Sequence, residues 1–359
     1  MNNSQNIFKI KSIDKADCKE FWLTSIENHG KGIKIIDHAI DFLRSNNAQA
    51  FSIRLFGNQD DLSIGNEELR SEKLQEITCP PLLLIENSSE LRIQLHAISK
   101  VKTSPLYFDN ELIGREFEDN NARYLMLHIL PDNANETRYN QAENMLNKAD
   151  KILIAFNSSF ADTIRTWLYA DNILDWYDQL NKVRNVFFEQ HGIFNRLVPA
   201  STGIGLANLS GTAMATQVLA VIPKNGNISI KRAASPLQKP ALDYKSSFSR
   251  GVKIQTPNDQ KLYVSGTASI NKKGETIFVG DTAAQLDITM EIVDAILADA
   301  NMSWADTANA MVYFKHRKDF YLFDNFCREK NLNIPHVKLH ADVCRDDLLF
   351  EIELDAIKY

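Results

Sequence analysis

The chain has 359 residues, 44% of them hydrophobic and 24% charged, and its 40 basic and 46 acidic side chains leave a net charge of −6. This is the composition of a folded globular protein, and the length exceeds one small core, so we expect two or three units. The sequence has no dense Lys/Arg cluster, no long apolar run and no signal-peptide core. These absences argue against nucleic acid and membrane partners and favour a cytoplasmic location.

The N-terminal third carries one helical pattern and several strand patterns. Apolar periodicity predicts a helix over 31–45 and strands near 50–56, 82–86, 91–97 and 123–130. Two arrangements of these elements are open. They form either a third, degenerate copy of the unit described below or extra strands of the first sheet.

The middle of the chain alternates helices and strands. The pattern predicts helices at about 139–151 and 174–188 and strands at 152–156, 166–170 and 216–223. Residues 226–260 contain Gly, Pro, Ser and Lys and are interpreted as an irregular connector between the units.

The C-terminal part predicts a β-β-α-β-α-β-β unit with two helices on one face of a mixed sheet. Its predicted elements are a hairpin of 261–270 and 275–280 around Asn271–Gly274, helices at 285–300 and 319–330, and strands at 310–314, 337–343 and 348–356. In the last strand Phe350, Ile352 and Leu354 alternate with Glu351, Glu353 and Asp355, which is typical of a half-buried strand.

An internal repeat supports two copies of this unit. A shift of 144 residues aligns 141–184 with 285–328 and gives 14 identities in 44 ungapped positions. The identities continue from the first helix through the following turn and strand, so two similar amphipathic helices do not account for them.

Standard cofactor and metal motifs are absent from the sequence. It contains no GxGxxG, GxxxxGK[ST], HExxH or GxSxG. The four cysteines, at positions 18, 79, 327 and 344, match no zinc or redox spacing and are interpreted as reduced thiols. We therefore expect no metal and no organic cofactor.

The C-terminal unit resembles the YjgF/RidA superfamily of small enamine/imine deaminases, which is also described as chorismate-mutase-like in fold. The resemblance rests on VSG at 264–266, the Gly274 hairpin, YFKHRKDF at 313–320, Pro335 and the FEIELDA strand. It implies an α/β (α+β) fold of tandem units with helices packed on one face of mixed sheets. In those deaminases an Arg follows the Pro and binds the substrate carboxylate, whereas His336 follows Pro335 here, so imine deamination is disfavoured.

Longer segments resemble the chorismatase family, which releases pyruvate from chorismate. They are NRLVPASTGIG (195–205), SPLQKPALDYKSSFSR (235–250), VSGTASI (264–270) and HADVCRDDLLFEIELD (340–355). The resemblance covers about 115–359 and divides the chain into an N-terminal domain with a degenerate RidA-like unit (1–225), the connector (226–260) and a C-terminal RidA-like domain (261–359).

The chemistry implied by this resemblance needs an acid that is protonated near neutral pH. Pyruvate release requires a proton on the terminal methylene carbon of an enol ether, and burial raises the pKa of a carboxyl toward that range. By the resemblance, Glu351 occupies the position of the family's catalytic glutamate. Periodicity alone favours all three acids of this strand facing water; that interpretation stays for Asp355, and Glu353 is left open.

Cys344 carries the prediction of the product. By the resemblance, chorismatases that make 3-hydroxybenzoate have Cys at this position, and a ring hydroxyl replaces water as the nucleophile before aromatisation. Ala268 is predicted to line the same pocket and, if Ala there favours water attack, points to the hydrolytic product instead. Chorismate hydrolysis and a mixed 3-/4-hydroxybenzoate output therefore stay open.

Donors for the two substrate carboxylates are expected among Arg165, Arg250 and Arg345, because Arg binds carboxylates through two hydrogen bonds. A loop at Ser201, Thr202 and Gly203 is expected to offer backbone N–H groups to an anion. Tyr244 is expected to donate a further hydrogen bond. On an alternating strand Arg345 would point away from Cys344.

The sequence therefore predicts a chorismatase of the 3-hydroxybenzoate synthase type, with chorismate as its small-molecule partner. Tandem units can replace the subunit contacts of trimeric relatives, so we expect a monomer. An imine deaminase and a protein that binds a small carboxylate without turnover are the remaining alternatives.

Overall fold

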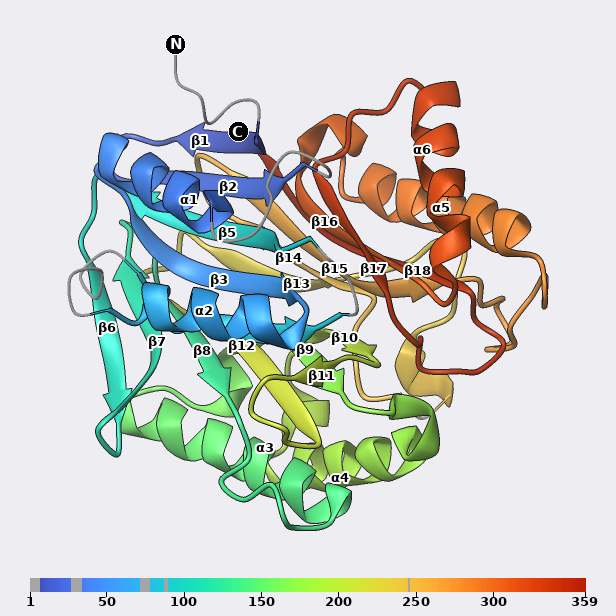
Figure 1. Ribbon diagram of the computed structural model, residues 1–359, viewed down its shortest axis with the longest axis horizontal. Coiled ribbons are helices and arrows are strands. Elements are labelled where there is room, and N and C mark those ends of the chain that lie inside the picture. The colour runs from blue at the N-terminus through green and yellow to red at the C-terminus, as the bar shows by residue number, and fades with distance from the viewer. Residues whose placement is uncertain (1–6, 27–33, 72–77, 87–89, 245) are drawn as a thin grey trace.

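The structure is a computed structural model that describes residues 7–26, 34–71, 78–86, 90–244 and 246–359. It contains three six-stranded sheets, each with its own pair of helices (Figure 1).

The first unit occupies the N-terminal third. Its elements are β1 (Phe8–Asp14), β2 (Lys19–Ser25), α1 (Lys34–Ser45), β3 (Gln49–Gly57), α2 (Gln59–Leu69), β4 (Leu82–Ile85) and β5 (Arg92–Ser99). Residues 31–33 of the predicted first helix lie outside the described residues.

The second unit follows directly. Its elements are β6 (Thr103–Phe108), β7 (Glu111–Glu118), β8 (Ala122–Ile129), α3 (Arg138–Ala155), β9 (Thr163–Ala170), α4 (Tyr177–Gln190), β10 (Ala200–Ile204) and β12 (Met214–Pro223); β11 (Ala207–Asn208) joins the first sheet.

The third unit is C-terminal. Its elements are β13 (Ser229–Ala233), β14 (Gly251–Gln255), β15 (Gln260–Ala268), α5 (Thr282–Asp299), β16 (Thr307–Phe314), α6 (Phe320–Glu329), β17 (His336–His340) and β18 (Phe350–Lys358).

The three units share one topology. Their sheets contain the orders β1-β2-β5-β3-β4, β7-β8-β12-β9-β10 and β14-β15-β18-β16-β17, in which the last strand inserts at the centre. Of the two arrangements left open for the N-terminal third, the structure has the third copy. The predicted fold, an α/β (α+β) array of β-β-α-β-α-β-β units with helices on one face of mixed sheets, is confirmed.

Repeated residues form the same local structures in the second and third units. Ser159 N donates to Asp162 at 2.9 Å and Ser303 N donates to Asp306 at 2.8 Å, which closes the same capping box before β9 and β16. Gln141 accepts from Ala213 N at 2.7 Å, just as its counterpart Gln285 accepts from a backbone N–H before β18. The identities at the 144-residue shift therefore mark structural hydrogen bonds.

Three sequence predictions are wrong. Residues 152–155 are the last turn of helix α3 and Phe156 is its C-cap, because Ile152 and Leu153 continue the buried stripe of the helix. Residues 275–280 form no strand; an isolated Ile270–Thr276 bridge joins them to the preceding segment, and Phe278 has a φ of +58°. Residues 226–260 are not simply a connector, because β13 and β14 lie there and extend the third sheet.

Each sheet buries both of its faces. One face packs on the unit's own helices, which gives three separate helix–sheet cores. The other face contributes to a central core that contains side chains of all three units, among them Phe51, Trp167 and Tyr313. The polar face that alternation predicts for a half-buried strand is therefore covered by a neighbouring unit.

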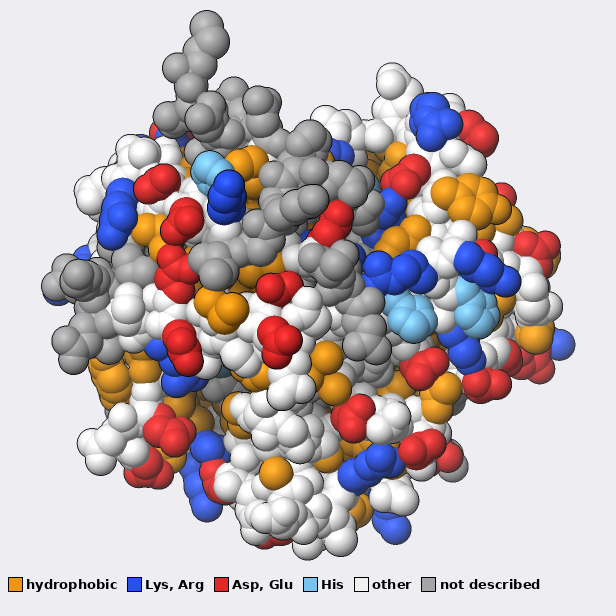
Figure 2. All heavy atoms as spheres, viewed as in Figure 1, with side chains coloured by type: hydrophobic (Ala, Val, Ile, Leu, Met, Phe, Trp, Pro, Cys, Tyr) orange, Lys and Arg blue, Asp and Glu red, His pale blue; other side chains and the backbone are white. Residues whose placement is uncertain are grey.

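Charged side chains on the surface are mixed in sign. On the face in Figure 2 acidic and basic side chains are interspersed. No helix in the described part of the chain combines the length and the apolar composition needed to cross a bilayer.

Candidate functional site

The acidic side chains of β18 point toward the interior. Glu351 and Glu353 are 5% and 2% exposed, and Asp355 is partly buried. Their alternation with Phe350, Ile352 and Leu354 is as the sequence indicates, but the second and first units cover the acidic face. The interpretation that these acids face water is wrong, including for Asp355.

Glu351 lines a pocket between the second and third units. Strand β10 lies beside β15, and isolated bridges join Ala200 to Ser249 and Gly205 to Asp342. The pocket is lined by Tyr177, Arg184, Ser201, Gly203, Ser246, Phe248, Arg250, Gly266, Ala268, Ile270, Cys344, Arg345 and Glu351.

Gly266 makes room for the Glu351 carboxyl. A Cβ at position 266 would overlap Glu351 Oε1 and lie 3.1 Å from Thr202 Cγ2. The pairing of β15 with β18 shifts between Val264 and Thr267, which places Gly266 in the irregular part of the strand. The glycine of the VSG motif is thus required because the Glu351 carboxyl packs closely against its backbone.

The Glu351 carboxyl makes no hydrogen bond or ion pair with any residue that the structure describes. Burial raises its pKa to about 8 and the charge of Glu353 acts in the same direction, while Arg165 and Arg250 oppose the shift. A carboxyl in this state keeps its proton at neutral pH, and its unpaired oxygens face the pocket. It therefore has the protonation state and the access of a general acid.

Behind Glu351, a hydrogen-bonded ion pair holds Glu353. The Arg165 guanidinium donates to the Glu353 carboxylate and, at 2.8 Å, to Thr202 Oγ1. Thr202 also donates to Glu353 and accepts from Gly266 N at 2.9 Å. Arg165 and Thr202 do not line the pocket, so they contact Glu353 and β15 in place of the substrate groups expected from the sequence.

Cys344 lies in the loop before β18 and lines the pocket. Burial raises the pKa of its thiol to about 12, and the neighbouring Glu351 adds to the increase. The thiol is therefore protonated at neutral pH, and it lacks the thiolate that a nucleophilic cysteine needs. Cys344 therefore contributes a small, weakly polar surface to the pocket.

Two of the three predicted arginines reach the pocket. Arg250 lines it and donates to Lys239 O at 3.2 and 3.1 Å through Nε and Nη2. Arg345 lines it and donates to Gly274 O at 2.8 Å. Arg345 follows Cys344 in a loop and not in a strand, so both side chains face the pocket and the predicted alternation is wrong.

Ser201 and Gly203 line the pocket from a strand, not from a loop. Strand β10 pairs in parallel with β9, and Ser201 N donates to Ser265 Oγ at 2.9 Å. An extended, paired backbone does not form the expected anion-binding loop. Tyr244 ends a short 3₁₀ turn, Ala241–Tyr244, and its side chain lies outside what the structure describes.

The sequence predictions missed Tyr177 and Arg184, seven residues apart on α4. Arg184 is 3% exposed and donates to Ser247 O at 2.6 Å, and Tyr177 is partly buried. Their spacing could have indicated that the two residues act together, because residues seven positions apart lie on the same face of a helix, two turns from each other. Both residues are identical to their counterparts in the internal repeat, Tyr321 and Arg328. Their recurrence in the two copies is most simply interpreted as a structural role.

The inner part of the pocket is small, with a volume of about 40 Å³. It shares Tyr177, Ser246, Cys344 and Arg345 with an outer depression of about 830 Å³ beside α4. Because a benzene ring needs a cavity of about 150 Å³, a cyclic ligand enters only when these side chains move apart. The outer depression is the approach to Glu351.

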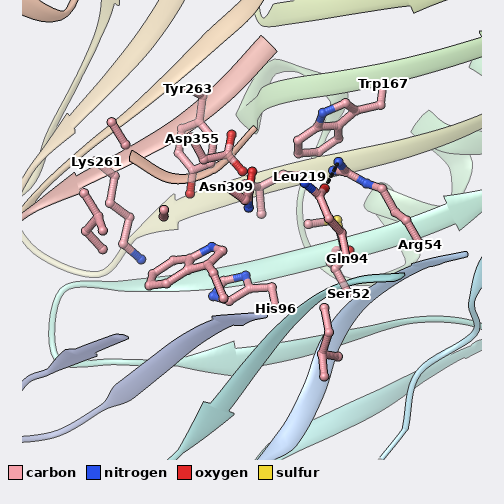
Figure 3. A pocket seen from close by; sticks show the side chains of 16 residues that line it. Ser52, Arg54, Gln94, His96, Trp167, Leu219, Lys261, Tyr263, Asn309 and Asp355 are labelled. Carbon is pink, nitrogen blue, oxygen red and sulfur yellow. Dashed lines mark hydrogen bonds between the residues drawn. The ribbon is translucent and has the colours of Figure 1, made fainter. Parts of the chain in front are cut away.

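A separate polar cavity lies where the three units meet (Figure 3). Its volume is about 30 Å³, and Arg54, Trp167 and Asp355 reach it from the first, second and third units. Burial raises the pKa of Asp355 to about 6, against the opposing effect of Arg165 and Arg54. The Glu351 pocket, in contrast, shares four lining residues with the large outer depression, so it is the better candidate for an organic ligand.

The ion pairs around this junction join distant parts of the chain. Lys261 Nζ lies 2.7 Å from Glu20 Oε1, and Lys15 Nζ lies 3.2 Å from the same oxygen and 3.1 Å from Asp119 Oδ2. These contacts connect all three units. In the part of the chain that the structure describes, no three His, Cys, Asp or Glu side chains are placed to hold a metal ion.

Comparison with known proteins supports both resemblances. The sequence model of the family described as Endoribonuclease L-PSP matches residues 239–358. A chorismatase of Streptomyces rapamycinicus is 29% identical over 218 residues, which are 53% of this chain and 62% of that protein. A 3-hydroxybenzoate synthase of Streptomyces hygroscopicus is 27% identical over 222 residues, 54% of this chain and 63% of its own length.

The fold matches at full length. The crystal structure of a chorismatase superimposes with a TM-score of 0.68 at 15% identity, over 97% of this chain and 100% of that one. The resemblance to chorismatases that the sequence indicates is therefore confirmed, and the two folds agree. By sequence, the chain spans less than two thirds of the length of the curated relatives it matches.

Proposed function

We propose that this chain is a chorismatase that releases pyruvate from chorismate and forms 3-hydroxybenzoate. The observation that carries the proposal is the Glu351 carboxyl, which is buried, protonated at neutral pH, without a partner among the described residues and directed into a pocket with arginines. The similarity to a chorismatase and to a 3-hydroxybenzoate synthase supplies the substrate class.

In the proposed reaction Glu351 protonates the terminal methylene carbon of the enolpyruvyl group. The electron pair of the C=C bond forms the new C–H bond and leaves an oxocarbenium-like centre. The oxygen of the neighbouring ring hydroxyl attacks the ring carbon that bears the ether, and the bond from this carbon to the ether oxygen breaks. The electron pair of that bond goes to the oxygen of pyruvate, which leaves as a ketone, and the hydroxyl proton returns to Glu351. The resulting epoxide opens at its other carbon, and loss of the proton from the attacked carbon makes the ring aromatic. The two products together have the composition of chorismate, so the reaction needs no oxidant and consumes no water. General acid catalysis of this kind contributes about 10²–10⁴-fold in rate.

The other pocket residues receive binding roles in this proposal. Arg250 and Arg345 bind the substrate carboxylates, because their guanidinium groups line the pocket and match a carboxylate in shape. Ser201 and Gly203 form part of the pocket wall. Arg165 and Thr202 are positioning residues that act through Glu353 and β15.

Cys344 and Ala268 favour different products. The uncharged Cys344 thiol is a poor partner for an attacking water, which favours the internal nucleophile and 3-hydroxybenzoate. Ala268 is 3% exposed, lines the same pocket and leaves room that a water could fill. The alternatives are hydrolysis to a 3,4-dihydroxycyclohexadiene carboxylate and a mixed 3-/4-hydroxybenzoate output.

The deaminase alternative has less support. His336, which stands where those deaminases have Arg, packs edge-to-face against Phe323 with ring centroids 4.7 Å apart, and burial lowers the pKa of its imidazole to about 4. It offers no positive charge to a carboxylate. A binding protein without turnover would have no use for an unpaired, protonated carboxyl in its pocket.

The test is chromatography of a chorismate incubation with the wild type and Glu351→Gln. Pyruvate and 3-hydroxybenzoate from the wild type only would support the proposal. Pyruvate together with a dihydrodiol would support Glu351 as the acid, and would show that the reaction is hydrolysis and that 3-hydroxybenzoate is not the product. Unchanged chorismate with the wild type would overturn the function and leave the deaminase and binding-protein alternatives.

We also propose that the protein is a monomer. The three units contact one another within one chain through the central core. The resemblance to the YjgF/RidA superfamily implies that contacts of this kind join the separate subunits of a trimer there. Sedimentation equilibrium at micromolar concentration is expected to give the mass of one chain. A stable trimer would contradict this.

A further inference from the structure

The shared topology of the units creates three equivalent interfaces, and strand registers identify the position that corresponds to Glu351 in each. Glu351 lies opposite Tyr313 of β16. In the second unit, Ala215 lies opposite Tyr169, the repeat counterpart of Tyr313. In the first unit Arg92 of β5 lies opposite Phe56 of β3. The acid is therefore present at one of three equivalent places.

The interface between the third and first units is filled by charged side chains. Arg92 donates to Lys338 O and to the Glu86 carboxylate, and Arg317 donates to the other oxygen of Glu86. Lys338 Nζ lies 2.6 Å from Asp324 Oδ2. These side chains fill the space at this interface that corresponds to the Glu351 pocket between the second and third units.

The interface between the first and second units contains a cavity of about 330 Å³. By register, its lining corresponds to that of the Glu351 pocket. Leu83 stands at the place of Gly203 and Ile113 at that of Arg250. Leu130 and Leu209 stand at the places of Ala268 and Cys344. Aliphatic side chains thus replace Arg250 and Cys344 of the Glu351 pocket, and the space is larger.

The second cavity also has a polar part, and the polar residues that line it are Asn66, Arg70, Glu111, His128, Lys148, Asn208 and Ser210. Arg70, at the end of α2, is exposed and has no ion pair with the residues described. Asn66 Oδ1 is buried and lacks a hydrogen-bond partner within the same part of the chain. His128 accepts from Gln217 Nε2 at 3.0 Å, and burial, with Arg54 and Arg70, lowers its pKa to about 3. His128 is thus neutral. Lys148 lies 2.6 Å from Asp132 Oδ1 in an ion pair, so Arg70 is the cation of this lining without a described ion-pair partner.

We propose that this second cavity is a non-catalytic binding site for a hydroxylated aromatic monocarboxylate. The aliphatic walls bury the ring, and about 330 Å³ exceeds the roughly 150 Å³ that accommodates benzene. Arg70 pairs with the carboxylate, and Asn66 Oδ1 accepts from the ring hydroxyl. With Ala215 in place of the acid, a bound molecule is not protonated and leaves unchanged.

The lining of the cavity supports this binding site independently of the proposed reaction. If that reaction is correct, the ligand class includes its product, and the cavity is then a product-sensing site. If the chain does not consume chorismate, the binding prediction stands unchanged. The two proposals therefore fail in different experiments.

The test is calorimetric titration with 3-hydroxybenzoate as the probe. Arg70→Gln removes the carboxylate partner, and Leu209→Trp fills the space. Arg328→Gln is the matched control, because Arg328 is also an exposed arginine at the C-terminal end of a helix, in the last turn of α6. Thermal unfolding of each variant, which should match the wild type for both arginine changes, shows that the chain is folded.

Binding that weakens about tenfold in Arg70→Gln, disappears in Leu209→Trp and is unchanged in Arg328→Gln supports the site. Any separate binding at the Glu351 pocket stays in all three variants. Equal stoichiometry and affinity in the wild type, Arg70→Gln and Leu209→Trp would overturn the proposal. Equal affinity for benzoate and 3-hydroxybenzoate would contradict the proposed hydrogen bond from the ring hydroxyl to Asn66.

Discussion

The carboxyl of Glu351 occupies the space in which a side chain on residue 266 would begin. A Cβ on Gly266 would overlap Glu351 Oε1, and the atom it meets is the end of a flexible side chain, not backbone. The glycine therefore determines where the acid lies, while the strand itself tolerates a change.

Gly266→Ala is expected to move the carboxyl and leave the fold intact. Misplacing a reacting group by about 1 Å lowers a rate about 10²-fold. Turnover of chorismate should fall by that order, with a melting temperature within a few degrees of the wild type. Gly226→Ala is a matched control, since a Cβ there meets nothing within 4 Å. Full activity in Gly266→Ala would show that the Glu351 position is not critical.

The activity is expected to depend on pH through Glu351. Burial raises its pKa to about 8, so the acid is protonated below that pH and loses its proton above it. Plots of kcat/KM against pH should be level at neutral pH and fall on the alkaline side near pH 8. The residual activity of Glu351→Gln should lack this limb. If the decrease on the alkaline side remained in Glu351→Gln, it would have to come from the titration of another group.

The same group links stability to pH. With a pKa near 4.5 in the unfolded chain and about 8 in the folded one, the native state holds the extra proton between these values. Stability from this group is therefore complete below pH 4.5 and is lost as pH rises through 8. Urea unfolding at pH 6 and pH 9 should show a larger loss in the wild type than in Glu351→Gln, on the order of a few kcal/mol. Equal losses would contradict the raised pKa.

Cys344 is expected to affect the product more than the rate. Its protonated thiol lines the pocket beside Glu351, so Cys344→Ala makes room for water without changing the acid. The share of dihydrodiol should increase and that of 3-hydroxybenzoate should decrease, as measured by chromatography. Cys327→Ala, on α6 outside the pocket, is the control. An unchanged product ratio would remove Cys344 from product selection.

Arg165 is expected to support the fold through Glu353. Arg165→Met leaves the Glu353 carboxylate buried without its main cation, and breaking a buried ion pair costs about 3–5 kcal/mol. Adding Glu353→Gln should recover a large part of this loss, because the uncompensated charge is removed. Chemical denaturation of the two single variants and the double variant measures the coupling. Additive effects would show that the two side chains do not interact.

Much of the site could be predicted from the sequence because its residues lie in segments with clear local patterns. Glu351, Cys344, Arg250 and Ala268 all line one pocket, as the resemblance implied. Arg165 could not be placed, since a buried arginine and a substrate-binding one look the same in a strand. Arg184 was missed because helical periodicity does not tell which neighbouring unit a helix face meets.

The sequence by itself determined the repeated unit, its helix caps and the alternation along β18, because these depend on residues close in the chain. Only the tertiary structure decided that the acidic face of β18 is covered by another unit. That burial gives Glu351 its proton at neutral pH and distinguishes three topologically equal interfaces: one with an acid, one with an aliphatic cavity and one filled by ion pairs. The physical reason is desolvation, which arises from contacts between residues more than a hundred positions apart.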